Sequence, residues 1–311
     1  MPPVHCVTGA FGFSGSYIAK RLLAAGLAVQ TLTGSLERAS PLRPAVRALP
    51  FHFDHFEQLV QSLRGVAVLY NTYWVRFNYR DFGYAQAVRH SATLLAAAKE
   101  AGVGRIVQIS ITNAAEDSPL EYFRGKAEVE RLLAETGIPY TVLRPALLFG
   151  PEDIVINNIA WLLRHLPVFP LFGLGRYRLR PVFVDDLAAL AVAQGAAAGR
   201  AVIDAVGPET FSFRDLVATI GRAIGKNRPR VPVPPALGFL VARLAGLVVH
   251  DVVVTRDEIT GLMQGLLDVP SPATGDTRLT AWLAQHGATI GRHYAGELSR
   301  RDDRRSPYSR Y

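Results

Sequence analysis

Short apolar runs alternate with amphipathic stretches over the first half of the chain. The runs are rich in Val, Ile, Leu and Thr and predict buried strands, while the stretches between them repeat apolar residues at helical spacing. This alternation is typical of a parallel sheet covered by helices on both faces. The predicted strands are 4–8, 28–33, 67–71, 105–110 and 140–143, and the predicted helices are 14–25, 54–63, 82–101 and 121–136.

The pattern changes after residue 150, where prolines divide the chain into shorter elements. We therefore expect an α/β protein in which residues 1–150 form a Rossmann-type, doubly wound parallel sheet. Residues 151–300 are expected to form a smaller C-terminal substrate domain, with a segment at about 180–206 returning to the sheet. Residues 301–311 are expected to be a polar tail.

Three glycines mark the turn between the first predicted strand and the first predicted helix. Gly9 would allow a tight turn, Gly12 the approach of a pyrophosphate, and Gly15 close packing of helix on strand. The helix N-terminus then offers amide groups and the positive end of its dipole to the anion. An ordinary βα turn is the alternative, and the position between strand and helix argues against it.

Such a glycine turn indicates a site for NAD or NADP, and the end of the second predicted strand bears on the choice between these two dinucleotides. A carboxylate there would bind the 2′-hydroxyl of the adenosine ribose and select NAD. The chain instead has Thr33, with Arg38 slightly beyond. Because no carboxylate repels a 2′-phosphate, NADP is slightly favoured over NAD.

Tyr122 and Lys126 are four residues apart on a predicted helix and therefore share a face. A phenol with a pKa near 10 needs about 4 kcal/mol of stabilisation to exchange protons at neutral pH, and a nearby ammonium can supply it. Tyr122 would then be the general acid/base during hydride transfer. Such a pair also arises by chance, but its place after a strand ending in Ser110 favours the catalytic interpretation.

These motifs together resemble a known family. The turn 8–15, Tyr122-x-x-x-Lys126, Leu143-Arg-Pro145 and Val184-Asp-Asp-Leu187 resemble the extended and atypical short-chain dehydrogenase/reductases. The chain is most similar to epimerase/dehydratase-type members related to the nucleotide-binding accessory subunit of respiratory complex I. The resemblance runs from about residue 4 to about residue 215.

The resemblance implies further site residues. Lys126 would also hold the nicotinamide ribose, and Ser110 is our choice for the hydroxyl that shares the substrate oxygen with Tyr122, although the family position falls on or near Ile111. The implied cofactor contacts are Phe11, Gly12 and Phe13 at the pyrophosphate, Asp54 at the adenine, Asn71 and Thr72 beneath the riboses, and Pro145 to Leu148 beside the nicotinamide.

Two functions remain open. The favoured one is an NAD(P)-dependent oxidoreductase or epimerase/dehydratase acting on a nucleotide sugar or another carbonyl compound, with Tyr122, Lys126 and Ser110 in catalysis. The alternative is a non-catalytic NAD(P)H-binding structural or sensor protein. The unclear serine position and the apolar segment 236–249, which suits a membrane surface or a partner protein, favour the alternative.

Charge and composition narrow the partners. The net charge of +8 favours anionic partners. The chain has no basic run interleaved with aromatic residues, so we do not expect it to bind a nucleic acid. Arg176, Arg178 and Arg180 alternate as on one strand face, either to clamp a diphosphate or simply to face solvent. The eight histidines show no metal spacing, so no metal is expected. One cysteine and no visible secretory signal suggest the cytoplasm, and a homodimer remains open.

Overall fold

The computed structural model describes residues 3–80 and 82–310 and divides into two compact units. Unit 1 is built from the chain up to Pro145, from Val184–Ala205 and from Arg304–Tyr308. Unit 2 contains Ala146–Phe183, Val206–Asp303 and the last residues of the chain. The C-terminal segment Arg304–Tyr308, which the sequence suggests is part of a polar tail, is thus a component of unit 1, while Tyr311 lies outside the described residues.

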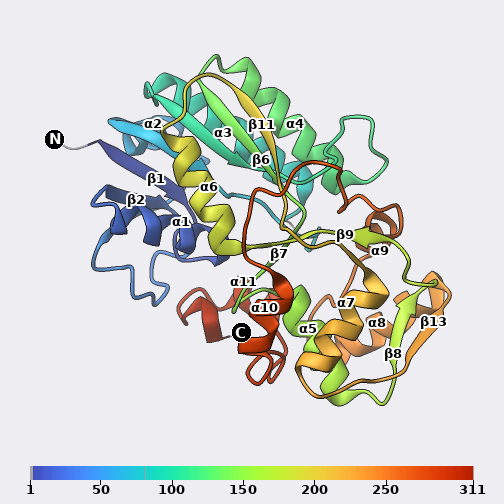
Figure 1. Ribbon diagram of the computed structural model, residues 1–311. Coiled ribbons are helices and arrows are strands. Elements are labelled where there is room, and N and C mark those ends of the chain that lie inside the picture. The colour runs from blue at the N-terminus through green and yellow to red at the C-terminus, as the bar shows by residue number, and fades with distance from the viewer. Residues whose placement is uncertain (1–2, 81, 311) are drawn as a thin grey trace. The chain divides into compact units, whose positions relative to one another are not determined.

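Unit 1 contains a parallel seven-stranded sheet in the order β11-β6-β5-β4-β1-β2-β3 (Figure 1). The strand order reverses beside β1, and in open α/β sheets ligands bind at the carboxyl ends of the strands at such a switch point. The strands are β1 (Val4–Thr8), β2 (Ala28–Leu32), β3 (Val46–Leu49), β4 (Val66–Asn71), β5 (Arg105–Ile109), β6 (Tyr140–Pro145) and β11 (Ala201–Ala205).

Helices cover both faces of this sheet, as the sequence predicts for a Rossmann-type fold (Figure 1). On one face α1 packs against α6, and the bidentate ion pair of Arg21 with Asp185 joins them at 2.8 Å. On the other, α3 packs against α2 and α4. The helices are α1 (Phe13–Ala24), α2 (Phe56–Leu63), α3 (Tyr84–Glu100), α4 (Glu121–Glu135) and α6 (Val184–Gly195).

Two local predictions need correction. The sequence pattern does not predict β3, which is short and lies at the edge of the sheet with the exposed Arg47 at its second position. The predicted helix over 54–63 begins later, at Phe56, with His55 rather than Asp54 as its N-cap. By contrast, the segment at about 180–206 does contribute α6 and β11 to unit 1.

Unit 2 has its own apolar core, to which α5, α7 and α10 contribute Ile159, Leu216 and Trp282 among others. Its strands form two-stranded sheets, β10 with β7, β12 with β9, and β13 with β8. The strands are β7 (Leu147–Phe149), β8 (Phe169–Phe172), β9 (Arg178–Leu179), β10 (Pro181–Phe183), β12 (Phe211–Ser212) and β13 (Arg230–Val233). The helices are α5 (Val155–His165), α7 (Phe213–Ala223), α8 (Pro235–Val249), α9 (Arg256–Met263), α10 (Leu279–His286) and α11 (Glu297–Asp302), and the 3₁₀ turn η1 (Tyr308–Arg310) follows.

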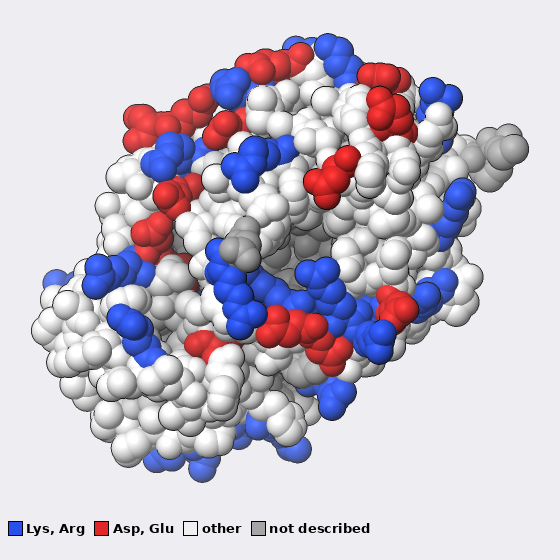
Figure 2. Space-filling model, turned by 180° about the vertical axis from the view of Figure 1, so that it is seen from behind, with Lys and Arg blue, Asp and Glu red and all other residues white. Residues whose placement is uncertain are grey.

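Charged side chains of both signs are interspersed over the face seen in Figure 2. Among the described residues, no helix is both long enough and apolar enough to cross a membrane. Within the same residues, no group of three or more His, Cys, Asp or Glu side chains is arranged to hold a metal ion.

Candidate functional site

The turn between β1 and α1 brings backbone atoms very close together. Gly9 has a φ of +67° and donates its amide to the carbonyl of Leu32 at 2.8 Å. A Cβ at Gly15 would lie 2.3 Å from the carbonyl oxygen of Gly9, so no other residue fits there without a shift of the backbone. Both glycines are therefore required by the geometry of the turn itself.

The N-terminus of α1 is suited to an anion. Its N-cap, Gly12, has no side chain to accept a bond from the first amides, and the first turn has no acidic residue. Phe11 lies on the same turn and is buried, whereas Phe13 is the first residue of the helix and is half-buried. A diphosphate at this point would meet backbone amides and the positive end of the helix dipole.

A hydrogen-bond network ties the carboxyl ends of the neighbouring strands together at the switch point. The hydroxyl of Thr8 donates to the side-chain oxygen of Asn71 at 3.0 Å and accepts from the backbone amide of Thr72 at 2.7 Å. The Thr72 hydroxyl returns a bond of 2.6 Å to the carbonyl of Thr8. Asn71 also donates to Gln108 of β5 at 2.8 Å. These side chains form a fixed floor beside the glycine turn.

The position that would read the adenosine ribose lies directly after β2. Thr33 is buried, and its hydroxyl accepts the amide of Ser35 at 3.0 Å. Arg38 is only 5% exposed, because its guanidinium donates to the carbonyl of Ser306 at 3.1 Å and stacks on Tyr308 at 5.8 Å. Arg38 therefore anchors the C-terminal segment instead of pointing into solvent.

Other arginines approach this ribose-reading loop, residues 33–43. Arg304 donates to the carbonyl of Gly34 at 3.2 Å, and Arg305 pairs with Glu37 at 2.9 Å. Arg43 lies 5.8 Å from the ring centroid of Phe11 and donates to the carbonyl of Leu36. The sequence pattern does not predict that residues after 300 reach this loop, because the contact spans nearly the whole chain.

An aromatic cluster follows the loop around Asp54, which the family resemblance places at the adenine. The rings of Phe51 and Phe53 stack at 4.8 Å, and Phe53 stacks on His90 at 4.0 Å. Burial lowers the pKa of His90, and the carboxylate of Asp54 opposes this shift. Asp54 itself is exposed. Asp54 is thus placed next to an aromatic platform from α3 and the segment before α2.

Lys126 is buried within unit 1. Its ammonium donates to the backbone carbonyl of Ile109 at 3.0 Å and lies 4.6 Å from the ring centroid of Trp74. Burial lowers the pKa of Lys126 to about 7, against a smaller opposing effect of the Glu130 carboxylate. This lysine is therefore only partly charged near neutral pH.

Tyr122 lies on the same side of α4 and also contacts Trp74. Its ring meets the Trp74 ring edge-on at 6.0 Å and the Tyr84 ring at 5.7 Å. Trp74 lies shortly after β4, which ends at Asn71. The structure gives it a specific place, in contact with both Tyr122 and Lys126.

Ser110 follows β5 and is buried. Its hydroxyl donates to the carboxylate of Glu130, which also accepts a bidentate bond from Arg144 with Nε at 3.0 Å from Oε1. The hydrogen bond that Arg144 donates to Glu130 raises the pKa of Arg144 further. The Leu143-Arg-Pro145 motif includes Arg144, but no pattern in the sequence predicts Glu130 as the partner of this arginine.

The segment expected beside the nicotinamide begins at the end of β6. The carbonyl of Pro145 accepts the amide of Thr112 at 3.0 Å within unit 1. Leu148 belongs to unit 2, where it lies on β7 opposite Val182 of β10.

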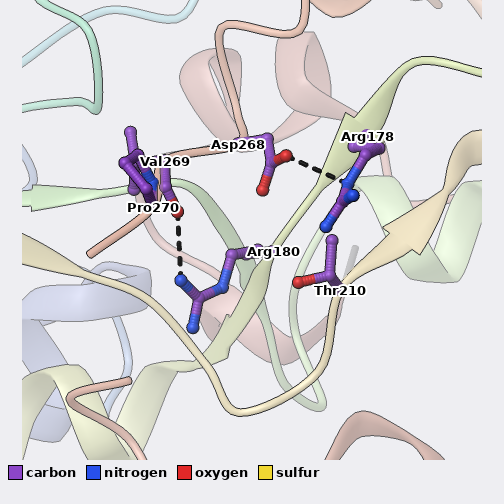
Figure 3. A pocket seen from close by; sticks show the side chains of 6 residues that line it. All are labelled: Arg178, Arg180, Thr210, Asp268, Val269 and Pro270. Atoms are coloured by element: carbon purple, nitrogen blue, oxygen red, sulfur yellow. Dashed lines mark hydrogen bonds and ion pairs between the residues drawn. The ribbon is translucent and has the colours of Figure 1, made fainter. Parts of the chain in front are cut away.

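Two of the alternating arginines of unit 2, Arg178 and Arg180, border a cavity of about 350 Å³ (Figure 3). Arg180 donates to the carbonyls of Val269, Ser271 and Gly207, and Arg178 pairs with Asp268 at 3.1 Å. Arg176 is exposed. Arg180 thus supports the surrounding backbone. This role differs from both interpretations of the sequence, in which the arginines either clamp a diphosphate or face solvent.

Comparisons with known proteins agree with this geometry. A family model described as NAD(P)H-binding matches residues 9–156. The chain is 29% identical over 225 residues to subunit 9 of the 1 alpha subcomplex of mitochondrial NADH dehydrogenase [ubiquinone] from Arabidopsis thaliana, covering 68% of this chain and 56% of that protein. The chain thus spans little more than half the length of this relative.

Two further proteins show how widely the fold is shared. The photosystem II assembly factor Ycf39 of Cyanidium caldarium is 25% identical, with 77% of each chain covered. The solved structure of triphenylmethane reductase from Citrobacter sp., complexed with NADP(H), superposes with a TM-score of 0.75 at 21% identity, covering 91% of this chain and 99% of that one. The last similarity establishes the fold alone.

Proposed function

The chain fits the extended short-chain dehydrogenase/reductase family, and we propose that it holds NADP(H) in unit 1 as a lasting structural or sensing component. The proposal is carried by the observation that the two groups that would assist Tyr122 already donate hydrogen bonds to other acceptors of the chain. Lys126 donates to the carbonyl of Ile109, and Ser110 donates to Glu130. Both groups would act in catalysis, and Lys126 would also contact the nicotinamide ribose, so nucleotide binding depends on these two groups less than catalysis does.

The charge on Lys126 argues in the same direction. A fully charged ammonium is needed to bring the Tyr122 phenol toward ionisation at neutral pH. With a pKa near 7, Lys126 carries this charge only part of the time, and its ammonium faces a backbone carbonyl and an indole ring. Two relatives in sequence are named as a subunit of mitochondrial NADH dehydrogenase and as a photosystem II assembly factor, which suits a binding role.

The residues around the glycine turn fit the dinucleotide. Gly9 has a positive φ that side chains disfavour, and Gly15 leaves no room for a side chain. The helix α1 presents its N-terminus, and Thr8 with Thr72 builds the floor. In this arrangement the backbone at Gly12 and Phe13 would hold the pyrophosphate. The bound nicotinamide would supply hydride chemistry if a substrate could reach it.

The preference for NADP rests on the charge around the ribose-reading loop. Arg43 and Arg304 both donate to backbone carbonyls of this loop, close to where a 2′-phosphate would lie. A phosphate there would meet guanidinium groups, which favour its oxygens. Glu37, the acid of this loop, is paired with Arg305.

A second candidate function is the oxidoreductase or epimerase/dehydratase with Tyr122 as acid/base. It is favoured by the shared face of Tyr122 and Lys126 and by their common contact with Trp74. In that case a nucleotide sugar or other carbonyl compound would exchange hydride with the nicotinamide while Tyr122 moves the proton. A cytoplasmic location and a homodimer belong to this proposal as further predictions.

The two candidates are separated by one experiment. The purified protein is denatured, released nucleotide is identified by mass spectrometry, and the exchange of bound nucleotide and its redox change are followed with aldehydes and nucleotide sugars. The proposal expects retained NADP(H), slow exchange and no turnover. Turnover that is lost in Tyr122→Phe, with nucleotide affinity unchanged, would establish the second candidate and overturn the first.

A further inference from the structure

One side of α8 is apolar and exposed to solvent. Six side chains recur along it at helical spacing and stand well out of unit 2. The exposed fractions are 49% for Leu237, 52% for Leu240, 47% for Val241, 58% for Leu244, 74% for Leu247 and 78% for Val248. We call this set the outer face of α8. A contiguous apolar face of this kind on a helix marks an interaction site.

The opposite side of α8 explains why the leucines point outward. Gly238 and Gly246 are the buried residues of the helix. A Cβ at Gly238 would lie 2.6 Å from the ring of Phe172 on β8, and one at Gly246 would lie 2.5 Å from the carbonyl of Asp251. The close approach at both points fixes the rotation of the helix, so the outer face cannot turn inward without separating α8 from β8.

The segment that leads into α8 and through it carries charge of one sign. Residues 216–250 contain no Asp or Glu, and their basic residues are Arg222, Lys226, Arg228, Arg230 and Arg243. Arg243 is exposed on α8 at the flank of the outer face, and Val231 of β13 adds a further exposed apolar side chain. The acid that follows the helix, Asp251, is buried and accepts the amides of Glu297 and Leu298.

We propose that α8 docks unit 2 on the surface of a lipid bilayer that contains anionic phospholipid. The helix would lie in the plane of the interface with its outer face among the acyl chains and with Arg243 and Arg230 at the headgroups. An exposed apolar face flanked by basic residues is the pattern of interfacial helices. Anionic headgroups complement the surrounding positive charge, whereas a protein partner would need an unusually acidic rim to do so.

The experiment is flotation of the full chain with vesicles of phosphatidylcholine alone or mixed with phosphatidylglycerol. The wild-type protein is expected to float with the mixed vesicles and to be released by salt, because salt screens the charge attraction. Leu244→Gln combined with Leu247→Gln should weaken this binding by more than about tenfold, since both side chains would leave the acyl region. Val202→Gln, at an equally exposed valine on β11 of unit 1, is the control and should bind like the wild type.

Thermal unfolding checks that each variant folds, and Arg243→Glu provides a second test by reversing the charge at the flank. It should reduce binding to the mixed vesicles without changing the unfolding temperature. The proposal is overturned if the wild type does not float, or if the glutamine variants float as well as the wild type. It is also overturned if light scattering shows an oligomer that the glutamine variants dissociate, because the outer face would then bind a second copy of the chain.

Discussion

Helices α1 and α8 both bring glycines into close contact with a neighbouring element, and each exposes a different surface as a result. In α1, Gly15 allows the helix to approach the turn at Gly9 so that its N-terminus meets the end of β1. In α8, Gly238 allows the helix to approach Phe172 and leaves a row of leucines and valines outside. The same close packing thus prepares a polar backbone site in unit 1 and an apolar side-chain surface in unit 2.

The strongest way to break this comparison is to add one methyl group to each helix. Gly15→Ala places a carbon 2.3 Å from the Gly9 carbonyl, so the turn must deform. We expect loss of dinucleotide binding and a loss of stability of roughly 1–3 kcal/mol. Isothermal titration calorimetry and urea unfolding measure the two effects.

Gly238→Ala is the matched change in α8. The added carbon would meet the Phe172 ring at 2.6 Å, and the expected result is a similar loss of stability of about 1–3 kcal/mol. Affinity for NADP should stay at the wild-type value, because no group of the glycine turn is altered. A parallel loss of NADP affinity in this variant would show that the two helices are not independent.

The buried lysine gives a prediction about pH. Because the pKa of Lys126 is lowered to about 7 in the folded state, the unfolded chain binds more protons above that pH. The free energy of unfolding should therefore rise by about 2 kcal/mol between pH 7 and pH 9 through this group alone. The Lys126→Met variant should lack this increment in urea unfolding at the two pH values, and an unchanged increment would place the ionisation elsewhere.

The smallest expected effect concerns the choice of dinucleotide. Arg304→Ala should weaken NADP binding by roughly three- to tenfold and leave NAD binding nearly unchanged, since only NADP carries the 2′-phosphate. Arg64→Ala is the control, because Arg64 is exposed and lies between the end of α2 and the start of β4, at the amino ends of the parallel strands and not at their carboxyl ends. Equal losses for NAD and NADP would show that Arg304 acts only through the fold of the loop.

The sequence predicts the sheet and the glycine turn well because their signals are local. Strand and helix periodicity, together with Gly9, Gly12 and Gly15, lie within short windows. The edge strand β3 was missed because it has only four residues, of which the polar Arg47 is one. Local patterns could not define its role, which depends on pairing with β2.

The surroundings of the candidate site are harder to predict, since they join distant parts of the chain. Tyr122 and Lys126 could be selected by spacing, but the contact of both with Trp74 depends on the packing of α4 near the end of β4. The same holds for Ser110 and Glu130, and for Arg38 with Ser306. Outward exposure of the apolar face of α8 also depends on tertiary packing, because the sequence is compatible with either a buried helix or an interfacial one.

The central claim is that the turn at the start of α1 holds a nicotinamide dinucleotide. The most direct measurement is calorimetric titration of the nucleotide-stripped wild-type protein with NADP and with NAD, repeated with Gly15→Ala. We predict one site per chain, tighter binding of NADP than of NAD, and no heat of binding in the variant. A wild-type protein without affinity for either dinucleotide would contradict the claim.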